Sequence, residues 1–318
     1  MSSAITTDIS FCQQLLKEGQ LVAIPTETVY GLAANAFDKK AVKKIFEMKG
    51  RPFFNPLIVH IHSLEQLKDL TECIPDNALK LANAFWPGPL TLILPKGDKV
   101  PDIITAGKST VGVRMPNHPL MLALLKGLPF PLAAPSANPF TRVSPTSAAH
   151  VADYFGNRIP AILDGGDCRI GLESTIVGFD NGKPMVYRKG GISIEAIEAV
   201  VGPVDLMTED DTAPQAPGML SKHYSPRTPL IVTENVSEIL NDYRSKKIGV
   251  LSFSKIDFPD ATVVKALSPK GNLEEAAQSL FASLHALDSA GLDVIVAERF
   301  PEEGLGRSIN DRLRRAQN

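Results

Sequence analysis

Cysteine is scarce in this 318-residue chain, and its placement excludes a disulfide framework. The three cysteines, Cys12, Cys73 and Cys168, are odd in number, far apart and in no C-x-x-C arrangement. Disulfide-rich folds and zinc fingers need cysteines paired at suitable spacing. We therefore expect three buried, reduced thiols in a reducing compartment.

Long apolar runs and an excess of charge of one sign are also missing. No window approaches the roughly 20 apolar residues of a membrane-spanning helix. The first ten residues lack the charged and apolar regions of a signal peptide. Because 33 Lys and Arg nearly balance 35 Asp and Glu, bulk electrostatic binding to nucleic acid is disfavoured. The composition is that of a globular protein, which we expect in the cytoplasm without a membrane segment.

Short apolar runs alternate with amphipathic stretches as far as residue 206. The runs that predict strands are 21–24, 57–61, 91–94, 111–113, 132–134, 161–163, 175–177 and 185–187. The stretches that predict helices are 11–17, 40–48, 64–70, 77–85, 119–125 and 147–154. This pattern indicates an α/β or α+β domain at 1–206, built on a sizeable sheet.

The pattern stops near residue 207 and restarts after Pro229. The segment 207–229 begins with an acidic, proline-containing stretch without periodicity, which predicts a linker. Beyond it, the predicted strands are 230–233, 248–253, 262–265 and 293–297, and the predicted helices are 236–244, 273–290 and a last one toward Ala316. We expect a smaller, mostly parallel, Rossmann-like α/β domain at 230–318. It contains no glycine-rich nucleotide fingerprint.

Polar loops follow several predicted strands of the first domain. Such loops meet at one rim of an α/β sheet, where ligands commonly bind. They and the neighbouring turns supply cations and hydroxyl groups, at Lys49, Arg51, Arg114, Arg188, Thr28, Ser136, Ser144 and Ser174. Each loop also has a plain interpretation as a turn or a helix cap. Their concentration favours an anionic ligand with hydroxyl and amine groups.

Signals of covalent or metal catalysis are weak. There is no nucleophile elbow with a Ser-His-Asp order, and no reactive-cysteine signature. His60 and His62 would share one face of a strand, but two ligands do not define a metal site. The residue types therefore favour phosphoryl chemistry by positioning and electrostatics.

These segments resemble the YrdC-like domain family. The matching motifs are PTETVYG at 25–31, K-x-R…NPL at 49–57, WPGPLT at 86–91, VRMP at 113–116, PSAN at 135–138 and ESTI at 173–176. Their order and spacing match over roughly residues 10–203. APGM at 216–219 and KHYSP at 222–226, followed by a further α/β domain, look like the long two-domain form of threonylcarbamoyl-AMP synthases.

The resemblance implies a fold and a reaction. The fold would be a twisted α/β sheet with a deep, positively lined concave cavity. The enzyme would be a nucleotidyltransferase that condenses L-threonine, bicarbonate or CO2, and ATP into threonylcarbamoyl-AMP and pyrophosphate. A partner complex would then move the threonylcarbamoyl group to an adenosine of tRNA beside the anticodon.

The resemblance also implies roles for individual residues. The residues that would contact threonine are Thr28, His60, Arg114, Ala134 and Ser174. Those that would contact ATP are Arg51, Asn55, Thr110, Ser136, Ser144, Arg188 and Tyr224. Lys49 and Arg51 would be catalytic and face phosphate, and Mg2+ would accompany the nucleotide without an assigned side-chain ligand.

Our mechanistic hypothesis begins with the threonine amine, which loses a proton and captures CO2 or bicarbonate. The resulting N-carboxylate attacks the α-phosphorus of ATP in line with the departing pyrophosphate. Lys49, Arg51 and Arg188, with Mg2+, would offset the repulsion between the anionic groups. No general base is assigned, and His60 could serve as that base or orient the substrate.

An RNA-binding module is the alternative of a different class. It would use the basic stretch 39–51 and the basic residues 312–315, and direct contact with tRNA or double-stranded RNA could also accompany catalysis. The early lysines are equally compatible with a solvated helix face. Near-neutral charge and few aromatics argue against RNA as the main ligand. Carbamoyl transfer in hydrogenase maturation is a further alternative, but three scattered cysteines cannot form the zinc fingers expected there.

Tyr224 lies in the predicted linker, outside the strand pattern of the first domain. Its segment either folds over the cavity as a lid that excludes water or is a surface tether. If it is a lid, truncation after residue 206 lowers both catalytic activity and ATP affinity, measured by pyrophosphate release and nucleotide titration. Unchanged activity and affinity would contradict the lid.

Overall fold

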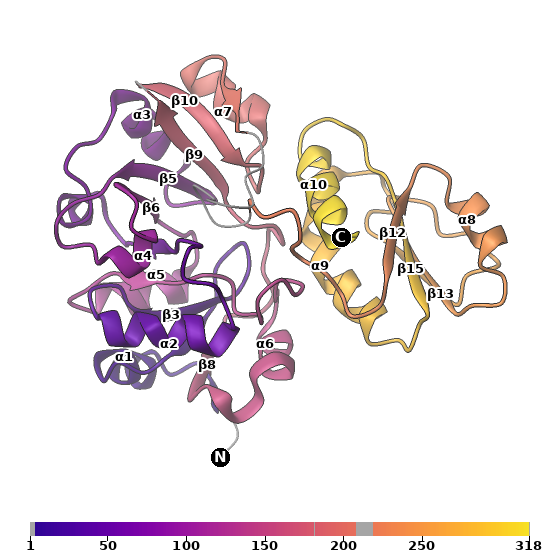
Figure 1. Cartoon of the computed structure of the whole chain (residues 1–318), viewed down its shortest axis with the longest axis horizontal. Helices are drawn as coiled ribbons and strands as arrows, with labels where there is room; N and C mark the ends of the chain where they lie inside the picture. Colours follow the sequence, from indigo (N-terminus) through magenta and orange to yellow (C-terminus); the bar gives the residue numbers. More distant parts are fainter. Residues whose placement is uncertain (1–3, 181, 208–218, 318) are drawn as a thin grey trace.

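The computed structural model describes residues 4–180, 182–207 and 219–317, which form two α/β bodies (Figure 1). The larger body is built on an eleven-stranded sheet of order β1-β8-β2-β3-β7-β4-β6-β5-β9-β10-β11. Its strands are β1 (Ala4–Thr6), β2 (Val22–Ile24), β3 (Gly31–Asn35), β4 (Ile58–His60), β5 (Leu90–Pro95), β6 (Thr110–Arg114), β7 (Leu132–Ala133), β8 (Ala161–Leu163), β9 (Thr175–Asp180), β10 (Lys183–Arg188) and β11 (Asp205–Leu206). The sheet mixes parallel and antiparallel pairs, so the expected α/β fold on a large sheet is confirmed.

Helices cover both faces of this sheet. They are α1 (Ile9–Lys17), α2 (Lys39–Lys49), α3 (Asp76–Phe85), α4 (Asp102–Thr105), α5 (Pro119–Lys126), α6 (Ala148–Phe155) and α7 (Ile194–Val201), with 3-10 turns at Leu64–Asp69 and Gly156–Arg158. Strand β2 shows how one apolar run supplies two cores, because successive side chains point to opposite faces. Ala23 packs in the core beneath α2, whereas Val22 and Ile24 pack in the core beneath α1 and α5.

Helix α2 begins and ends at residues suited to those positions. The Asp38 carboxylate caps its start by accepting from the N–H groups of Lys40 (2.8 Å) and Ala41 (3.3 Å). Gly50, with φ of 63°, ends it in the left-handed conformation that glycine adopts most easily. This stop places the segment from Lys49 to Asn55 against the rim of the sheet, where both named side chains are buried.

The smaller body has four parallel strands in the order β12-β15-β13-β14. Its elements are β12 (Leu230–Thr233), α8 (Val236–Asp242), β13 (Ile248–Ser252), β14 (Val263–Ala266), α9 (Leu273–Asp288), β15 (Val294–Glu298) and α10 (Gly306–Gln317). The expected small parallel α/β arrangement is therefore confirmed. Helices α9 and α10 lie on the side that faces the larger body (Figure 1).

The two bodies share one apolar cluster. Phe281 of α9 is fully buried there with Tyr224 of the connecting segment and with Val29 and Leu172 of the larger body. The rings of Tyr224 and Phe281 stack with centroids 5.6 Å apart. Burial of these large side chains holds the smaller body against the rim of the large sheet.

Some sequence expectations were wrong in detail. Strand β3 was not predicted, because its Gly-Leu-Ala-Ala-Asn sequence lacks the β-branched and aromatic residues that favour strands. The stretch 64–70 forms a 3-10 helix rather than an α-helix. Cys73 is exposed rather than buried, since it lies in a surface segment between Thr71 and α3. The expected thiols at Cys12 and Cys168 are buried.

Membrane insertion through a helix finds no support in the described residues, none of whose helices is long and apolar enough to cross a bilayer.

Candidate active site

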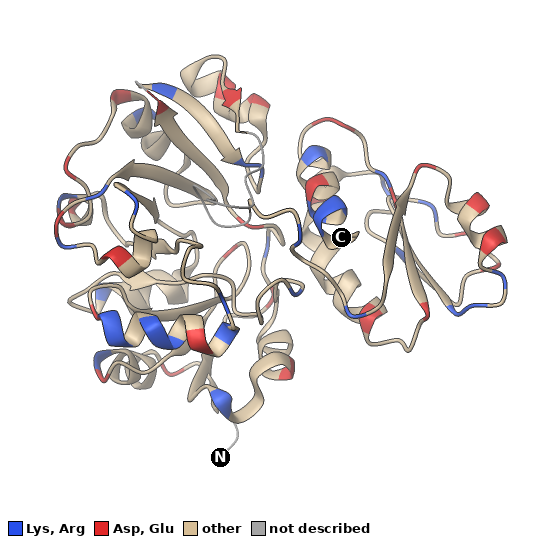
Figure 2. Ribbon diagram, viewed as in Figure 1, with Lys and Arg blue, Asp and Glu red and all other residues tan. Residues whose placement is uncertain are grey.

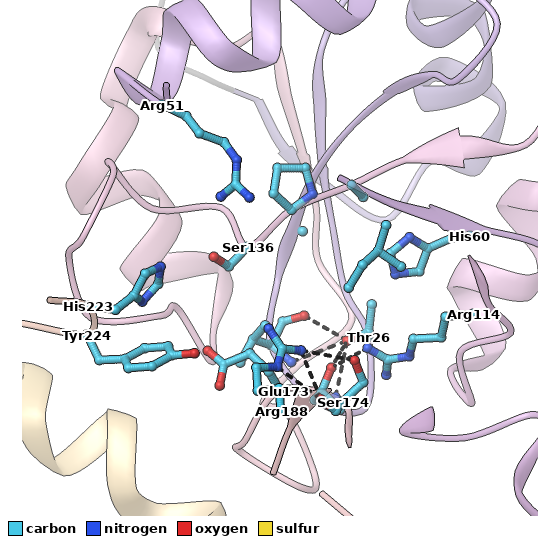
Figure 3. A pocket seen from close by; sticks show the side chains of 16 residues that line it. Thr26, Arg51, His60, Arg114, Ser136, Glu173, Ser174, Arg188, His223 and Tyr224 are labelled. Carbon is cyan, nitrogen blue, oxygen red and sulfur yellow. Dashed lines mark hydrogen bonds between the residues drawn. The ribbon is translucent and has the colours of Figure 1, made fainter. Parts of the chain in front are cut away.

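A cavity opens at the rim of the large sheet, where several strand ends and the connecting segment meet (Figure 3). Its lining residues are Thr26, Thr28, Val29, Gly31, Arg51, Ile58, His60, Arg114, Ala134, Pro135, Ser136, Glu173, Ser174, Arg188, His223 and Tyr224. In Figure 3, Arg51 and Arg114 lie on opposite sides of the cavity, and Arg188 lies between them. The arrangement therefore presents separate positive charges to one enclosed space.

Arg114, at the end of β6, forms one side of the cavity. Its Nη1 donates to the Thr28 hydroxyl (2.9 Å) and its Nε to the Gly88 carbonyl (3.3 Å). Its Nη2 lies 2.7 Å from a Glu27 carboxylate oxygen, and both side chains are buried. That contact is an ion pair without hydrogen-bond geometry, since neither Glu27 oxygen has a hydrogen-bond partner among the described residues. The guanidinium is thus held in place, while its Nη2 has no hydrogen-bond partner among the described residues.

A hydroxyl turn supports this side. The Thr26 hydroxyl donates to the Val29 carbonyl (2.7 Å) and accepts from the Thr28 N–H (3.1 Å). It also lies 2.8 Å from the Thr28 hydroxyl. Threonines commonly form such local side-chain to backbone turns, so the Pro-Thr-Glu-Thr sequence itself presents Thr28 to Arg114.

His60, at the end of β4, is neutral in this environment. Burial and the neighbouring Arg114 charge lower the pKa of His60 to about 3. Its Nδ1 is buried and has no hydrogen-bond partner within the described part of the chain. A neutral imidazole with an unused nitrogen can bind a polar ligand group.

Arg188 and Ser174 form the base of the cavity. Arg188 Nη2 donates to the carbonyl (2.9 Å) and the hydroxyl (3.1 Å) of Ser174. The Ser174 hydroxyl also lies 2.8 Å from that of Thr91. Burial lowers the pKa of Arg188, which shows the cost of desolvating a cation here.

Arg51 forms the other side. Its Nη2 donates to the Asn55 side-chain oxygen (2.6 Å) and the Pro56 carbonyl (2.8 Å), and its Nε donates to the Asn55 carbonyl (3.2 Å). Burial and the nearby Arg188 charge lower the pKa of Arg51 to about 9. Two arginines that repel each other across a cavity favour a bound anion.

Lys49 lies behind this side rather than in the lining. Its ammonium donates to the carbonyls of Ser136 (2.5 Å) and Asn138, and burial with the Arg51 charge lowers its pKa. These bonds hold the loop that carries Ser136 into the cavity. In this structure the lysine is therefore placed to position the loop, while Arg51 faces the open space.

Three other residues expected at the site also lie outside the lining. Asn55 orients Arg51, as described above. Ser144 is fully buried, and its hydroxyl donates to the Glu173 carboxylate (2.5 Å). Thr110 lies at the opposite end of β6 from Arg114. All the remaining expected residues line the cavity.

Several lining residues were not assigned from the sequence. They are Thr26, Val29, Gly31, Ile58, Pro135, Glu173 and His223. Most belong to the motifs at 25–31, 135–138, 173–176 and 222–226, so extending each assignment to its neighbours would have found them. Ile58 is an ordinary buried strand residue, and no sequence signal distinguishes it.

His223 and Tyr224 enter the cavity from the connecting segment. Tyr224 has a φ of 63°, an unusual backbone conformation for a bulky residue. Its hydroxyl and the His223 Nδ1 are buried without hydrogen-bond partners among the described residues. Burial and the nearby Arg51 charge lower the pKa of His223 far below its usual value. Residues 216–218 of the APGM motif lie outside the described residues.

A resident metal site finds no support in the described residues, among which no group of three or more His, Cys, Asp or Glu side chains could hold an ion. Mg2+ that accompanies a nucleotide is commonly held through phosphates and only one or two carboxylates. The expected Mg2+ therefore stays a prediction.

Two family models together match almost the whole chain. The Sua5–YciO–YrdC model, described as "Telomere recombination", matches residues 14–190. The model of the threonylcarbamoyl-AMP synthase C-terminal domain matches residues 192–317.

Full-length relatives are similar along both parts. The threonylcarbamoyl-AMP synthase of Pyrococcus abyssi is 46% identical over 95% of this chain and 91% of the relative. That of Bacillus subtilis is 45% identical over 95% and 90%. The crystal structure of P. abyssi Sua5 complexed with L-threonine matches with a TM-score of 0.92 at 46% identity, over 97% of this chain and 94% of that one. E. coli YciO, at 24% identity and a TM-score of 0.53 over 57% of this chain and 88% of that one, shares the fold.

The depressed pKa of His60 predicts a pH-dependent stability. An unfolded histidine has a pKa near 6.5, whereas that of folded His60 is about 3. Between these values the unfolded state binds more protons, so the unfolding free energy falls as pH falls. Replacing His60 by Gln removes this contribution, so the variant loses less stability between pH 6.5 and about pH 4, measured by urea titration. His62→Gln, outside the cavity, is the control, and equal pH slopes for wild type and His60→Gln would contradict the assignment.

Proposed function

The chain belongs to the threonylcarbamoyl-AMP synthase family, and from this we propose that it makes threonylcarbamoyl-AMP from L-threonine, bicarbonate or CO2, and ATP. Pyrophosphate is the second product, which makes the enzyme a nucleotidyltransferase. The observation that carries this proposal is the placement of Arg51 and Arg114 on opposite sides of one cavity (Figure 3). Two separate cations suit two anionic ligands that must meet.

The side of Arg114 suits threonine. A guanidinium can hold the amino-acid carboxylate through two parallel hydrogen bonds. Thr28 and Ser174 offer hydroxyl groups that can recognise the threonine hydroxyl, and the unused His60 nitrogen offers a further polar contact. A site built to bond a hydroxyl discriminates strongly against analogues without it. Ala134, buried in the lining, is suited to pack against the threonine methyl.

The side of Arg51 suits ATP. Arg51 and Arg188 can pair with the phosphates, and Ser136 contributes a hydroxyl between them. The Tyr224 hydroxyl, which has no hydrogen-bond partner among the described residues, is available to the nucleotide. Asn55 acts on this side by orienting Arg51. Ser144 acts through its hydrogen bond to Glu173, and Lys49 acts by holding the loop that carries Ser136.

The reaction joins these two sides. The threonine nitrogen gives up a proton and bonds to the carbon of CO2, or to that of bicarbonate, from which hydroxide leaves and takes up the proton as water. The resulting carboxylate oxygen attacks the α-phosphorus as pyrophosphate leaves. Arg114 orients the amino acid, while Arg51 and Arg188 stabilise charge on the phosphates in a water-poor cavity. Mg2+ bound to the nucleotide would neutralise part of the same charge.

Several finer assignments complete the proposal. The catalytic domain spans 1–206, the linker 207–229 and the C-terminal domain 230–318. The product passes to a tRNA threonylcarbamoyl-transfer complex, in the cytoplasm.

Direct tRNA or double-stranded RNA contact would use α2, whose outer face carries exposed lysines (Figure 2). Lys43 there also pairs with Glu47 of the same helix (3.4 Å), which equally suits a solvated face.

The reaction predicts dependence of pyrophosphate release on each substrate. With ATP, threonine and bicarbonate present, pyrophosphate accumulates, and omission of threonine reduces its release to background because no nucleophile forms. A coupled pyrophosphate assay measures this, with serine and valine as analogues lacking the methyl or the hydroxyl. Threonine-independent release at the full rate would defeat the proposal.

Substitutions on the two sides of the cavity should impair the use of different substrates. Arg51→Ala removes a charge-assisted contact to phosphate and weakens ATP use by about 1.5–3 kcal/mol. Arg114→Lys keeps a cation beside Glu27 but loses the guanidinium fork, so it raises the KM for threonine instead. Steady-state kinetics with each substrate varied in turn measure both effects, with exposed Arg158→Ala as the control. If each variant impaired the other substrate, the two assignments should be exchanged.

A further inference from the structure

Helix α10 of the smaller body places an arginine directly behind the cavity. Arg312 has no exposed surface and is one of the largest fully buried side chains in the described residues. Its Nε donates to the Glu173 carboxylate (3.0 Å) and its Nη2 to the Lys189 carbonyl (2.8 Å). Its Nη1 donates to the carboxylate of the neighbouring Asp311 (2.9 Å), which Arg315 also contacts (3.1 Å). Its guanidinium carbon lies 5.0 Å from the centroid of the Tyr224 ring. One side chain thus contacts three segments that form the cavity.

The carboxylate of Glu173 is the critical contact, because Glu173 itself lines the cavity. One of its oxygens accepts from Ser144 (2.5 Å) and the other from Arg312. A carboxylate beside a phosphate site repels the ligand unless a cation neutralises it, and the repulsion grows with burial. Arg312 supplies that cation from behind, outside the space that the ligand occupies.

The other contacts of α10 act on the same side of the cavity. Ser308 donates to the Gly190 carbonyl (2.9 Å), beside the Lys189 carbonyl that Arg312 holds, and these residues directly follow Arg188. Arg315 Nη1 donates to the Met219 carbonyl (3.0 Å), and its own carbonyl accepts from the His223 N–H (3.0 Å). The helix therefore holds the segments that bear Arg188 and Tyr224.

We propose that Arg312 is a positioning residue for the nucleotide, through which the C-terminal body completes the phosphate side of the active site. It neutralises Glu173 and supports the Tyr224 ring, so that ATP meets a cavity wall of net positive charge. Arg114 and His60, which are proposed to hold threonine, lie on the opposite side, whereas Ser174 lies beside Arg188 at the base of the cavity (Figure 3). This inference rests on the proposed function for the identity of the ligand.

A purely structural role makes a different prediction. Breaking a buried ion pair destabilises the fold by leaving a charge without its partner, and a general loss of structure would weaken both ligands alike. The positioning role weakens ATP selectively. It also predicts that removing the Glu173 charge lessens the need for Arg312, since the cavity wall then carries no carboxylate for Arg312 to neutralise.

The test compares Arg312→Gln, Arg312→Lys and the double variant Arg312→Gln/Glu173→Gln in the full chain. Calorimetric titration measures ATP and threonine binding separately, and thermal unfolding monitors the fold. We expect Arg312→Gln to weaken ATP by about tenfold or more while threonine binding stays within about twofold. The Lys variant, which keeps the charge, should lie between it and wild type. Arg299→Gln, at a half-exposed position of the same body where the arginine pairs with Glu234 and Glu302, should match wild type.

The double variant distinguishes neutralisation of the Glu173 charge from simple support of the surrounding structure by Arg312. We expect it to bind ATP more tightly than Arg312→Gln alone, because the uncompensated carboxylate is gone. Equal loss of both ligands, no loss of ATP affinity, or no recovery in the double variant would overturn the proposal. If Arg312→Gln does not fold, Arg312→Lys tests the selective loss of ATP affinity, and Arg312→Lys/Glu173→Gln compared with Arg312→Lys tests the recovery.

The result is separable from the proposed reaction. Failure of wild-type protein to release pyrophosphate in response to threonine would count against the reaction alone, because ATP titration of the variants does not depend on turnover. An ATP affinity that stays at the wild-type value in every Arg312 variant would count against this inference alone.

Discussion

The structure depends on keeping several arginines buried around one cavity. Arg51, Arg114, Arg188 and Arg312 are all nearly inaccessible to solvent, and taking a cation out of water is costly unless it is paired or hydrogen-bonded. Two of them have carboxylate partners, Glu27 for Arg114, and Glu173 and Asp311 for Arg312. The others are held largely by carbonyl, amide and hydroxyl oxygens, which orient a guanidinium without cancelling its charge. An anionic ligand completes this arrangement, so the cost of burial is converted into affinity and selectivity for anions.

Rigid elements hold these charges at fixed positions. Arg114 ends one strand and Arg188 another, while Gly50 stops α2 so that Arg51 turns toward the sheet. Gly190 lets the chain after Arg188 pass close to the Glu173 backbone, because a Cβ at that position would lie 2.4 Å from the Glu173 carbonyl oxygen. Positions this constrained reduce the reorganisation needed when charge develops on the phosphates, and such preorganisation is a main source of catalysis in phosphoryl chemistry.

The second body is part of the same constraint rather than an independent attachment. Phe281 packs against Tyr224, and Arg312 pairs with Glu173, so apolar burial and charge pairing act at one interface. The contact with Tyr224 also combines a ring face with a guanidinium, which is favourable when both are desolvated. A cavity wall that is held in place by a second body can change when the contact between the bodies changes, and this gives the C-terminal α/β body a physical connection to the chemistry of the first.

The sequence by itself determined much of this protein: the alternation of strands and helices, the small parallel second sheet, and the motifs that carry Thr28, Arg51, Arg114 and Ser174. These are local features, since periodicity, turn residues and motif spacing act over a few neighbouring positions. Only the tertiary structure decided which motif residues face the cavity. It turned Lys49 toward the carbonyls of Ser136 and Asn138, and placed Ser144 behind Glu173. Local pattern could not pair Glu173 with Arg312 either, because the two residues lie 139 positions apart. The packing of two separate hydrophobic faces brings them together.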